Sequence, residues 1–175
     1  MGDGARVVRT LARRRVTLGF VAGATTLILA NPTWGSWRAG LAIALVGEAI
    51  RVWAAGHLEK SREVTRSGPY RLTSHPLYLG SSVIALGVIV ASRSWLVGGV
   101  VASYMAATIS AAIQTEEAFL RKTFGTAYDD YKRFGAGTTM RRFSAARALR
   151  NREYRALLGL AAGFAFLALK IVLSI

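Results

Sequence analysis

The residues most able to do chemistry stand in two short stretches of an otherwise apolar chain. Residues 68–80 hold the first set, which includes Tyr70, Arg71, His75 and Tyr78. The second set is the adjacent carboxylate pair Glu116 and Glu117. Arginine can bind a carboxylate, glutamate can bind an ammonium group or ribose hydroxyls, and aromatic faces can bind a cation. Such a pocket suits a small zwitterion, and S-adenosylmethionine presents all of these groups.

Each of these residues also has a purely structural explanation. Proline fits the first turn of a helix, so Pro76 predicts a helix that starts directly after His75. Tyrosines are common at the membrane interface, and Glu117 precedes Arg121 at the spacing of a helical ion pair. We favour a pocket because the expected helical topology brings the two stretches together.

The composition predicts an integral membrane protein. Of the 175 residues, 53% are hydrophobic and only 18% are charged, and the apolar residues form long runs. A soluble domain of this length would carry more charge. The net charge of +14 fits cytoplasmic loops rich in Lys and Arg that face anionic lipid. No base-reading module is visible, so we expect no nucleic-acid partner.

We expect an all-α bundle of about five transmembrane helices that forms a single domain over residues 1–175. The candidate spans are residues 16–34, 37–58, 76–91, 95–115 and 156–175. The first apolar run is long enough to span the bilayer and lacks a cleavage site, so we expect a retained helix rather than a signal peptide. Lys170, near the end of the last span, is placed to snorkel.

Residues 116–155 form a basic segment that we expect on the cytoplasmic face. Its first half is amphipathic at helical spacing, and Gly125 is expected to divide it into two short helices. The N-terminal tail, residues 59–75 and this segment hold nearly all of the positive charge, which predicts that all three are cytoplasmic. The short turn at residues 92–94 makes the third and fourth spans an antiparallel hairpin, which brings His75 close to the glutamate pair.

Glu48 and Arg51 place two opposite charges inside the second expected span. Their spacing puts them on one helical face, and charges within a span usually meet a partner or a cavity. One interpretation is a mutually neutralising pair that holds the bundle together. The other is a pair that lines the cytoplasmic mouth of a pocket, and the sequence leaves both open.

Several other kinds of site are not indicated by the sequence. Two histidines, His57 and His75, and no cysteine make a metal centre unexpected. No glycine-rich phosphate loop, dinucleotide-binding fingerprint or nucleophile elbow is present. The polar stretches therefore remain the candidate site.

The same stretches resemble the isoprenylcysteine carboxyl methyltransferase family, whose superfamily includes phospholipid N-methyltransferases and small bacterial membrane methyltransferases. The resemblance covers roughly residues 47–134. It is carried by Arg51-Val52-Trp53-Ala54, Gly68-Pro69-Tyr70-Arg71, His75-Pro76-Leu77-Tyr78-Leu79-Gly80, Glu116-Glu117, Phe124-Gly125, Tyr128 and Tyr131. It implies an S-adenosylmethionine-dependent methyltransferase with its active site at the cytoplasmic membrane face.

The resemblance also implies roles for individual residues. The cofactor-binding set is expected to be Tyr70, Arg71, His75, Pro76, Tyr78, Leu79, Gly80, Glu116 and Glu117. The candidate catalytic groups are His75, Tyr78 and Glu117. The candidate acceptor-pocket residues are Glu48, Arg51, Trp53, Tyr131 and Arg133.

Two departures from the family pattern bear on the substrate. Many members carry Arg immediately before the His-Pro pair, where this chain has Ser74, and Arg71 is a candidate replacement. Many also carry Arg and then Val-Pro after the last tyrosine, where this chain has residues 132–135 with Arg133 one position away. These departures do not change the expected cofactor, but they leave the identity of the methyl acceptor open.

The expected reaction is methyl transfer to a small lipophilic or amphiphilic acceptor that enters from the bilayer. Prenylcysteine carboxylate, a lipid amine, an alkylated phenol and a thiol are all candidate acceptors. Holding the nucleophile in line with the methyl group supplies most of the catalysis. A carboxylate needs no base, whereas the other acceptors must lose a proton. We expect a multi-pass protein of the bacterial inner membrane, with a cytoplasmic N-terminus and anionic lipid as a second partner.

Two other function classes remain. A membrane oxidoreductase of the sterol-reductase kind would bind NADPH near the same membrane face. A non-enzymatic adaptor would bind anionic lipid through its basic segment, with an affinity that falls steeply with salt. Cofactor binding and its sensitivity to mutation of the polar stretches separate these alternatives.

Overall fold

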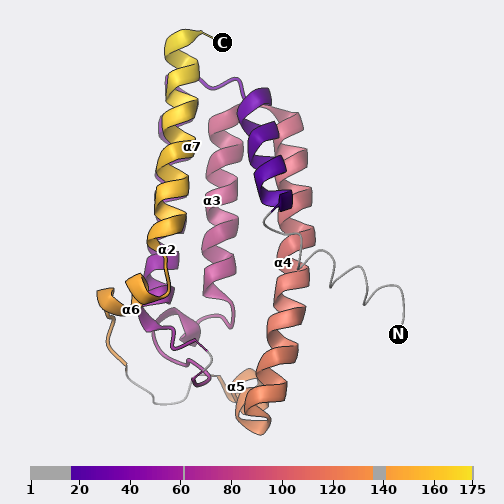
Figure 1. The fold of residues 1–175 in the computed structure, drawn as a ribbon, viewed down its shortest axis with the longest axis vertical. Coiled ribbons are helices and arrows are strands. Elements are labelled where there is room, and N and C mark those ends of the chain that lie inside the picture. The colour runs from indigo at the N-terminus through magenta and orange to yellow at the C-terminus, as the bar shows by residue number, and fades with distance from the viewer. Residues whose placement is uncertain (1–16, 61, 136–140, 175) are drawn as a thin grey trace, which may run out of the picture.

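The computed structural model describes residues 17–60, 62–135 and 141–174, and these residues form an all-helical fold without strands. Upright helices make a bundle, and short helices gather at one end of it (Figure 1). The helices are the N-terminal helix Thr17–Leu29, α2 (Trp34–His57), η1 (Gly68–Arg71), α3 (Pro76–Ser92), α4 (Trp95–Phe124), α5 (Thr126–Phe134), α6 (Ala145–Arg150) and α7 (Tyr154–Leu173). The all-α prediction is confirmed, while the basic N-terminal tail and the start of the first expected span lie outside the described residues.

α2 and α3 form the closest helix pair and run antiparallel. Their glycines face each other twice, with Gly40 opposite Gly87 and Gly47 opposite Gly80. A Cβ added at Gly47 would lie 2.6 Å from the carbonyl oxygen of Gly80, so only hydrogen fits there. Small residues at a helix interface let the two backbones approach closely. This pair is therefore the frame on which the other helices are arranged.

The hairpin between α3 and α4 forms as expected from the short turn in the sequence. Arg93 takes a left-handed conformation with φ 48°, and the Ser94 side chain caps α4 by accepting a hydrogen bond from the backbone N–H of Val97 at 3.3 Å. The backbone N–H of Asn31 donates to the carbonyl of Ser92 at 2.8 Å. The turn before α2 and the turn before α4 therefore lie together at one end of the bundle.

α4 packs on α3 much less extensively than α2 does, and the N-terminal helix lies between α3 and α4 (Figure 1). A helix of 30 residues is about 45 Å long, whereas the bilayer core is about 30 Å thick. Roughly the last third of α4 therefore extends past the apolar layer. The sequence placed the end of this span near residue 115, but the helix continues to Phe124 and breaks at Gly125, as expected for that glycine.

Lys170 of α7 holds the end of the N-terminal helix. Its Nζ donates to the carbonyl oxygens of Leu27, Ile28 and Ala30 at 3.2, 3.0 and 2.8 Å. The expectation that this lysine snorkels to the interface was wrong, because the residue is only 9% exposed and turns toward the bundle. The last carbonyls of a helix lack intrahelical partners, and an ammonium with three donors satisfies them.

The segment that carries α6 caps the other end of α2. The side-chain amide of Asn151 donates to the carbonyls of Ala55 and Leu58 at 2.8 and 2.9 Å. Arg147 Nε donates to Glu59 at 2.7 Å, and its Nη1 donates to the carbonyl of Gly56. These bonds satisfy the C-terminal carbonyls of α2 and hold the polar end of the bundle together.

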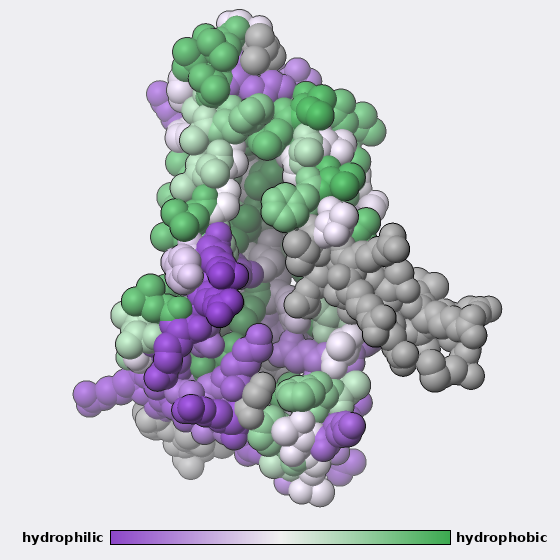
Figure 2. All heavy atoms as spheres, viewed as in Figure 1, coloured by the Kyte–Doolittle hydropathy of each residue, from purple (hydrophilic) through white to green (hydrophobic). Residues whose placement is uncertain are grey.

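Three helices, α2, α4 and α7, are long and apolar enough to cross a membrane, by length and composition. α3 has 17 residues, and the N-terminal helix is also among the shorter apolar helices of the described chain. Hydrophobic side chains cover most of the upper helices, and hydrophilic side chains gather at the lower end with α5 and α6 (Figure 2). This distribution is that of a membrane protein with one polar end.

Candidate functional site

His75 and the glutamate pair meet at the polar end of the bundle. His75 is the residue before the first turn of α3, with Pro76 in the first turn, so its ring projects from the start of that helix. Its Nε2 lies 3.2 Å from Oε1 of Glu117, and its Nδ1 lies 4.0 Å from Oε2 of Glu116. The two polar stretches singled out in the sequence therefore form one cluster between α3 and α4.

Glu117 is held by two cations in addition to His75. Nζ of Lys132 lies 2.8 Å from Oε1, and Nη2 of Arg121 lies 3.7 Å from Oε2. The Arg121 pair has the expected helical spacing. Lys132 was not anticipated, because it reaches Glu117 only after the chain reverses at Gly125 between α4 and α5.

Two polar atoms in this region have no hydrogen-bond partner among the described residues. They are Nδ1 of His75 and the hydroxyl of Tyr128, and both atoms are buried. The Glu117 carboxylate can only accept a hydrogen bond from Nε2 of His75. A neutral His75 therefore carries its hydrogen on Nε2 and keeps a lone pair on Nδ1. Burial, reinforced by the negative charge of Glu117, raises the pKa of Tyr128 to about 12, so its hydroxyl stays neutral.

Tyr131 supports the loop that precedes α3. Its hydroxyl donates to the carbonyl of Tyr70 at 2.6 Å, and its ring lies 5.9 Å from the guanidinium carbon of Arg66. Tyr70 is itself buried, and burial raises the pKa of its phenol. The structure thus places Tyr131, which we had assigned to the acceptor pocket, beneath the loop that carries His75.

The remaining predicted residues fall on different surfaces. Tyr78 lies beside His75, with ring centroids 5.8 Å apart, and Pro76 is buried. Gly80 packs against Gly47 at the α2–α3 interface. The exposed members of the predicted set are Trp53, Arg71, Leu79 and Arg133, and Glu116 is half-buried.

Glu48 and Arg51 belong to a three-charge cluster. Arg51 Nε lies 2.6 Å from Oε1 of Glu153 and 3.7 Å from Oε2 of Glu48. Arg51 Nη1 also donates to the Ser81 hydroxyl and, at 3.5 Å, to the carbonyl of Leu77. Glu153, which precedes α7, carried no signal of this role in the sequence, because it lies 102 residues from Arg51.

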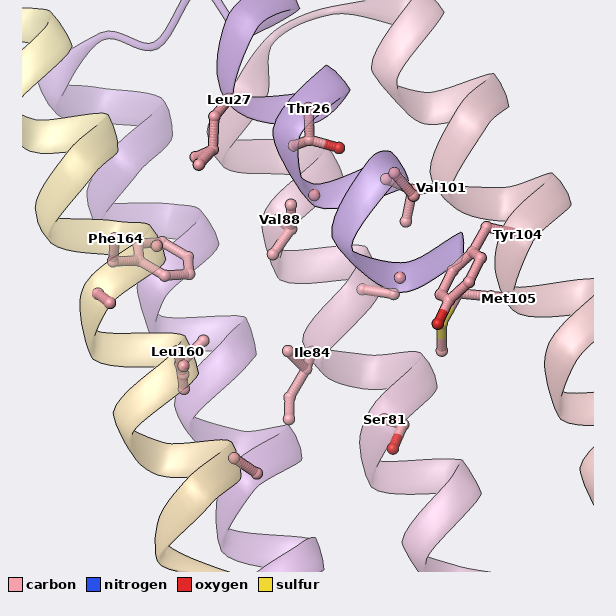
Figure 3. Close-up of a pocket in the computed structure, with 18 of the residues that line it drawn as sticks. Thr26, Leu27, Ser81, Ile84, Val88, Val101, Tyr104, Met105, Leu160 and Phe164 are labelled. Carbon is pink, nitrogen blue, oxygen red and sulfur yellow. The ribbon is translucent and has the colours of Figure 1, made fainter. Parts of the chain in front are cut away.

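Two cavities open between the N-terminal helix, α3 and α4. The larger has a volume of about 730 Å³, extends to α7, and is walled mainly by apolar side chains such as Ile84, Val88 and Leu160 (Figure 3). The smaller, of about 560 Å³, reaches Tyr78. The two share five residues, which are Gly19, Arg51, Ser81, Tyr104 and Met105. An apolar space therefore leads toward the aromatic neighbour of His75.

Comparison with known proteins identifies the family. The sequence profile of the phospholipid methyltransferases matches residues 33–127, which run from the cap of α2 into α5 and include His75 and both glutamates. The chain belongs to the phospholipid methyltransferase family. This match confirms the superfamily resemblance seen in the sequence and assigns the protein to a family of membrane methyltransferases.

Two relatives show how much of the chain is shared. The cobalt-zinc-cadmium resistance protein CzcN of Cupriavidus metallidurans is 32% identical over an alignment of 122 residues that covers 63% of this chain and 54% of that protein. The nickel-cobalt-cadmium resistance protein NccN of Alcaligenes xylosoxydans xylosoxydans is 32% identical over 96 residues, which are 54% of this chain and 43% of that protein. The chain thus spans about half the length of these curated relatives. No solved structure gives a significant match.

Proposed function

We propose that this protein transfers a methyl group from S-adenosylmethionine to a lipophilic acceptor at the cytoplasmic face of the membrane. The observation that carries the proposal is the cluster of His75, Glu116 and Glu117, which joins α3 to α4 beside the cavities. Membership of a methyltransferase family supports the same reaction class.

The residues of the cluster fit this cofactor. The buried Nδ1 of His75 and the hydroxyl of Tyr128 have unused hydrogen-bonding capacity within the described chain. The side chain of Glu116 is 43% exposed, so its carboxylate is accessible to an ammonium group or to ribose hydroxyls. A zwitterion with a cationic centre and hydroxyl groups would satisfy Glu116 and the hydroxyl of Tyr128.

When bound, the cofactor would supply an activated methyl group on a sulfonium sulfur. The protein would then have to orient the cofactor, align the acceptor with the methyl group and exclude water. Glu117 would fix the ring of His75 through Nε2, which leaves Nδ1 to accept a proton from an acceptor that must lose one. The aromatic ring of Tyr78 would lie between this base and the smaller cavity.

We further propose that the polar end of the bundle is cytoplasmic and that the protein resides in a bacterial inner membrane. The loop before α3, α5 and the segment around α6 all lie at that end, and they carry most of the described Lys and Arg residues. Positive residues favour the cytoplasmic side of a membrane and its anionic lipids. The acceptor would enter from the bilayer between the helices.

The test is calorimetric titration of S-adenosylmethionine and of S-adenosylhomocysteine into the purified protein in lipid nanodiscs. We expect saturable binding that Glu117→Ala abolishes and that Asp130→Ala preserves. Asp130 is an exposed carboxylate on α5 that forms no ion pair with the described residues, so it is a matched control for the loss of a negative charge. Absence of S-adenosylmethionine binding by folded protein would overturn the proposal. Binding of NADPH in its place would favour the reductase class.

A further inference from the structure

Arg51 is a charged residue that the two cavities share. It lines the larger and the smaller cavity, and no other charged residue of the described chain lines either. The walls around it are largely apolar, as the labelled side chains of Leu27, Ile84 and Val101 illustrate (Figure 3). Among the described residues, a molecule that occupies this space would therefore meet Arg51 as its charged partner.

Some, but not all, of the N–H donors of the Arg51 guanidinium have acceptors among the described residues. Nε donates to Glu153 at 2.6 Å, and Nη1 donates to the hydroxyl of Ser81. A guanidinium has five N–H donors, and the two on Nη2 have no acceptor among the described residues. The side chain keeps 20% of its surface exposed. Two donors are thus held in place and remain available to a ligand.

The positive charge of Arg51 is already balanced. Glu153 is bonded to it, Glu48 lies 3.7 Å away, and neither glutamate lines a cavity. With both carboxylates ionised, one positive and two negative charges leave the cluster net negative; with Glu48 protonated, the cluster is neutral. In neither state is there surplus positive charge to offset the cost of bringing an anion out of water.

A cationic head group is also poorly matched to this site. An ammonium group has three donors and no acceptor, and the charged group that it would meet in the cavity is another cation. The nearby hydroxyl of Ser81 already donates to the carbonyl of Leu77 at 2.9 Å and accepts from Arg51. An ammonium here would lose its hydration without gaining a carboxylate partner.

We propose that the cavities take an uncharged lipophilic acceptor with a hydroxyl head, of the alkylated phenol class, whose oxygen accepts hydrogen bonds from Nη2 of Arg51. A neutral oxygen uses the two available donors without adding net charge, and the apolar walls hold the body of the molecule. The inference rests on the proposed function and names the acceptor class for it.

The methylation step balances with the groups already named. A lone pair of the acceptor oxygen forms the O–CH₃ bond while the S–CH₃ bond of the sulfonium breaks, and sulfur keeps that electron pair as a neutral thioether. The hydroxyl proton passes to Nδ1 of His75. His75 lines neither cavity, but its ring lies 5.8 Å from the ring of Tyr78, which lines the smaller one. Donation by Arg51 stabilises the negative charge that develops on oxygen as the proton leaves.

The test compares three photo-crosslinking probes that carry the same alkyl chain and diazirine but end in a phenol, a carboxylic acid or a primary amine. Each probe is added to the full chain in nanodiscs of zwitterionic lipid at about pH 8.5, where the acid and the amine are charged and the phenol is neutral. Mass spectrometry then measures the labelling of peptides from α3 and α4. We expect the phenol probe to label them about tenfold more than either charged probe, a difference of about 1.4 kcal/mol in binding.

Two variants test the role of Arg51 itself. Arg51→Gln should reduce labelling by the phenol probe several-fold, whereas Glu153→Gln keeps the arginine, removes one negative charge and should increase labelling by the acid probe. Arg155→Gln is the control, because Arg155 is an exposed cation on α7 that lines neither cavity. Thermal unfolding of each variant shows whether it remains folded.

Labelling by the acid or the amine that equals or exceeds labelling by the phenol would overturn the inference. Failure of Glu153→Gln to raise labelling by the acid would also overturn it, and this result does not depend on the folding of Arg51→Gln. The probes are applied without cofactor, and S-adenosylhomocysteine binding is measured separately in the same nanodiscs. If S-adenosylhomocysteine does not bind but the probes remain selective, the proposed function is refuted. If it binds but the probes show no selectivity, only the acceptor class is refuted.

Discussion

Replacing Gly47 by alanine should weaken the whole bundle by forcing α2 and α3 apart. The new Cβ would lie 2.6 Å from the carbonyl oxygen of Gly80 and 2.7 Å from the backbone nitrogen of Ile84, where ordinary contact begins near 3.4 Å. Because both neighbours are backbone atoms, no side-chain rotation relieves the overlap. We expect a cost of about 3 kcal/mol, the upper part of the range for overpacking, less about 1 kcal/mol gained by replacing a helical glycine.

The net loss of about 2 kcal/mol corresponds to a fall in Tm of roughly 4–8 °C for a chain of this size. Gly99→Ala is the matched control, because that glycine also lies within a helix, α4, and an added Cβ there meets nothing within 4 Å. Differential scanning fluorimetry of the two variants in the same detergent measures the difference. A Tm for Gly47→Ala equal to that of Gly99→Ala would refute the close packing of α2 on α3.

Three further outcomes are expected. Lys170→Met should lower the free energy of unfolding by about 2 kcal/mol, since it leaves helix-terminal carbonyls without a charged donor, and a urea titration in detergent would measure this. The hydrogen bond from Arg147 holds the pKa of Glu59 below its usual value, so the pair stabilises the fold above about pH 4.3 and this contribution is lost as the pH falls through the lowered pKa. Thermal unfolding between about pH 7 and pH 3 should therefore show a larger loss for the natural chain than for Glu59→Gln. Lys132→Ala should weaken S-adenosylhomocysteine binding about tenfold by releasing Glu117, and unchanged affinity in calorimetry would argue against a positioning role for this lysine.

The elements of the fold follow from local signals that the sequence carries. The short turn around Arg93 predicts the α3–α4 hairpin, Pro76 predicts the start of α3, and Gly125 predicts the break after α4. Together these three features are enough to bring His75 to Glu117. The main cluster of the candidate site is therefore predictable from the sequence alone.

Contacts between residues far apart in the sequence could not be predicted in the same way. Lys132 reaches Glu117 only because α5 folds back, and Glu153 reaches Arg51 across a separation of 102 residues. No local pattern encodes either approach. A signal was available for the α2–α3 interface, since Gly40 and Gly47 are seven residues apart and Gly80 and Gly87 repeat the spacing, which places each pair on one helical face.

The bond between Lys170 and the N-terminal helix also sets an order of events during synthesis. The lysine follows the Ile28 carbonyl that it caps by 142 residues. At about 5–20 residues per second, a ribosome needs roughly 7–28 s to travel that distance. During this interval the N-terminal helix lacks its clamp, and the larger cavity lacks the wall that α7 supplies. The larger cavity is therefore one of the last parts of the molecule to form, because it is complete only after α7 has joined the bundle.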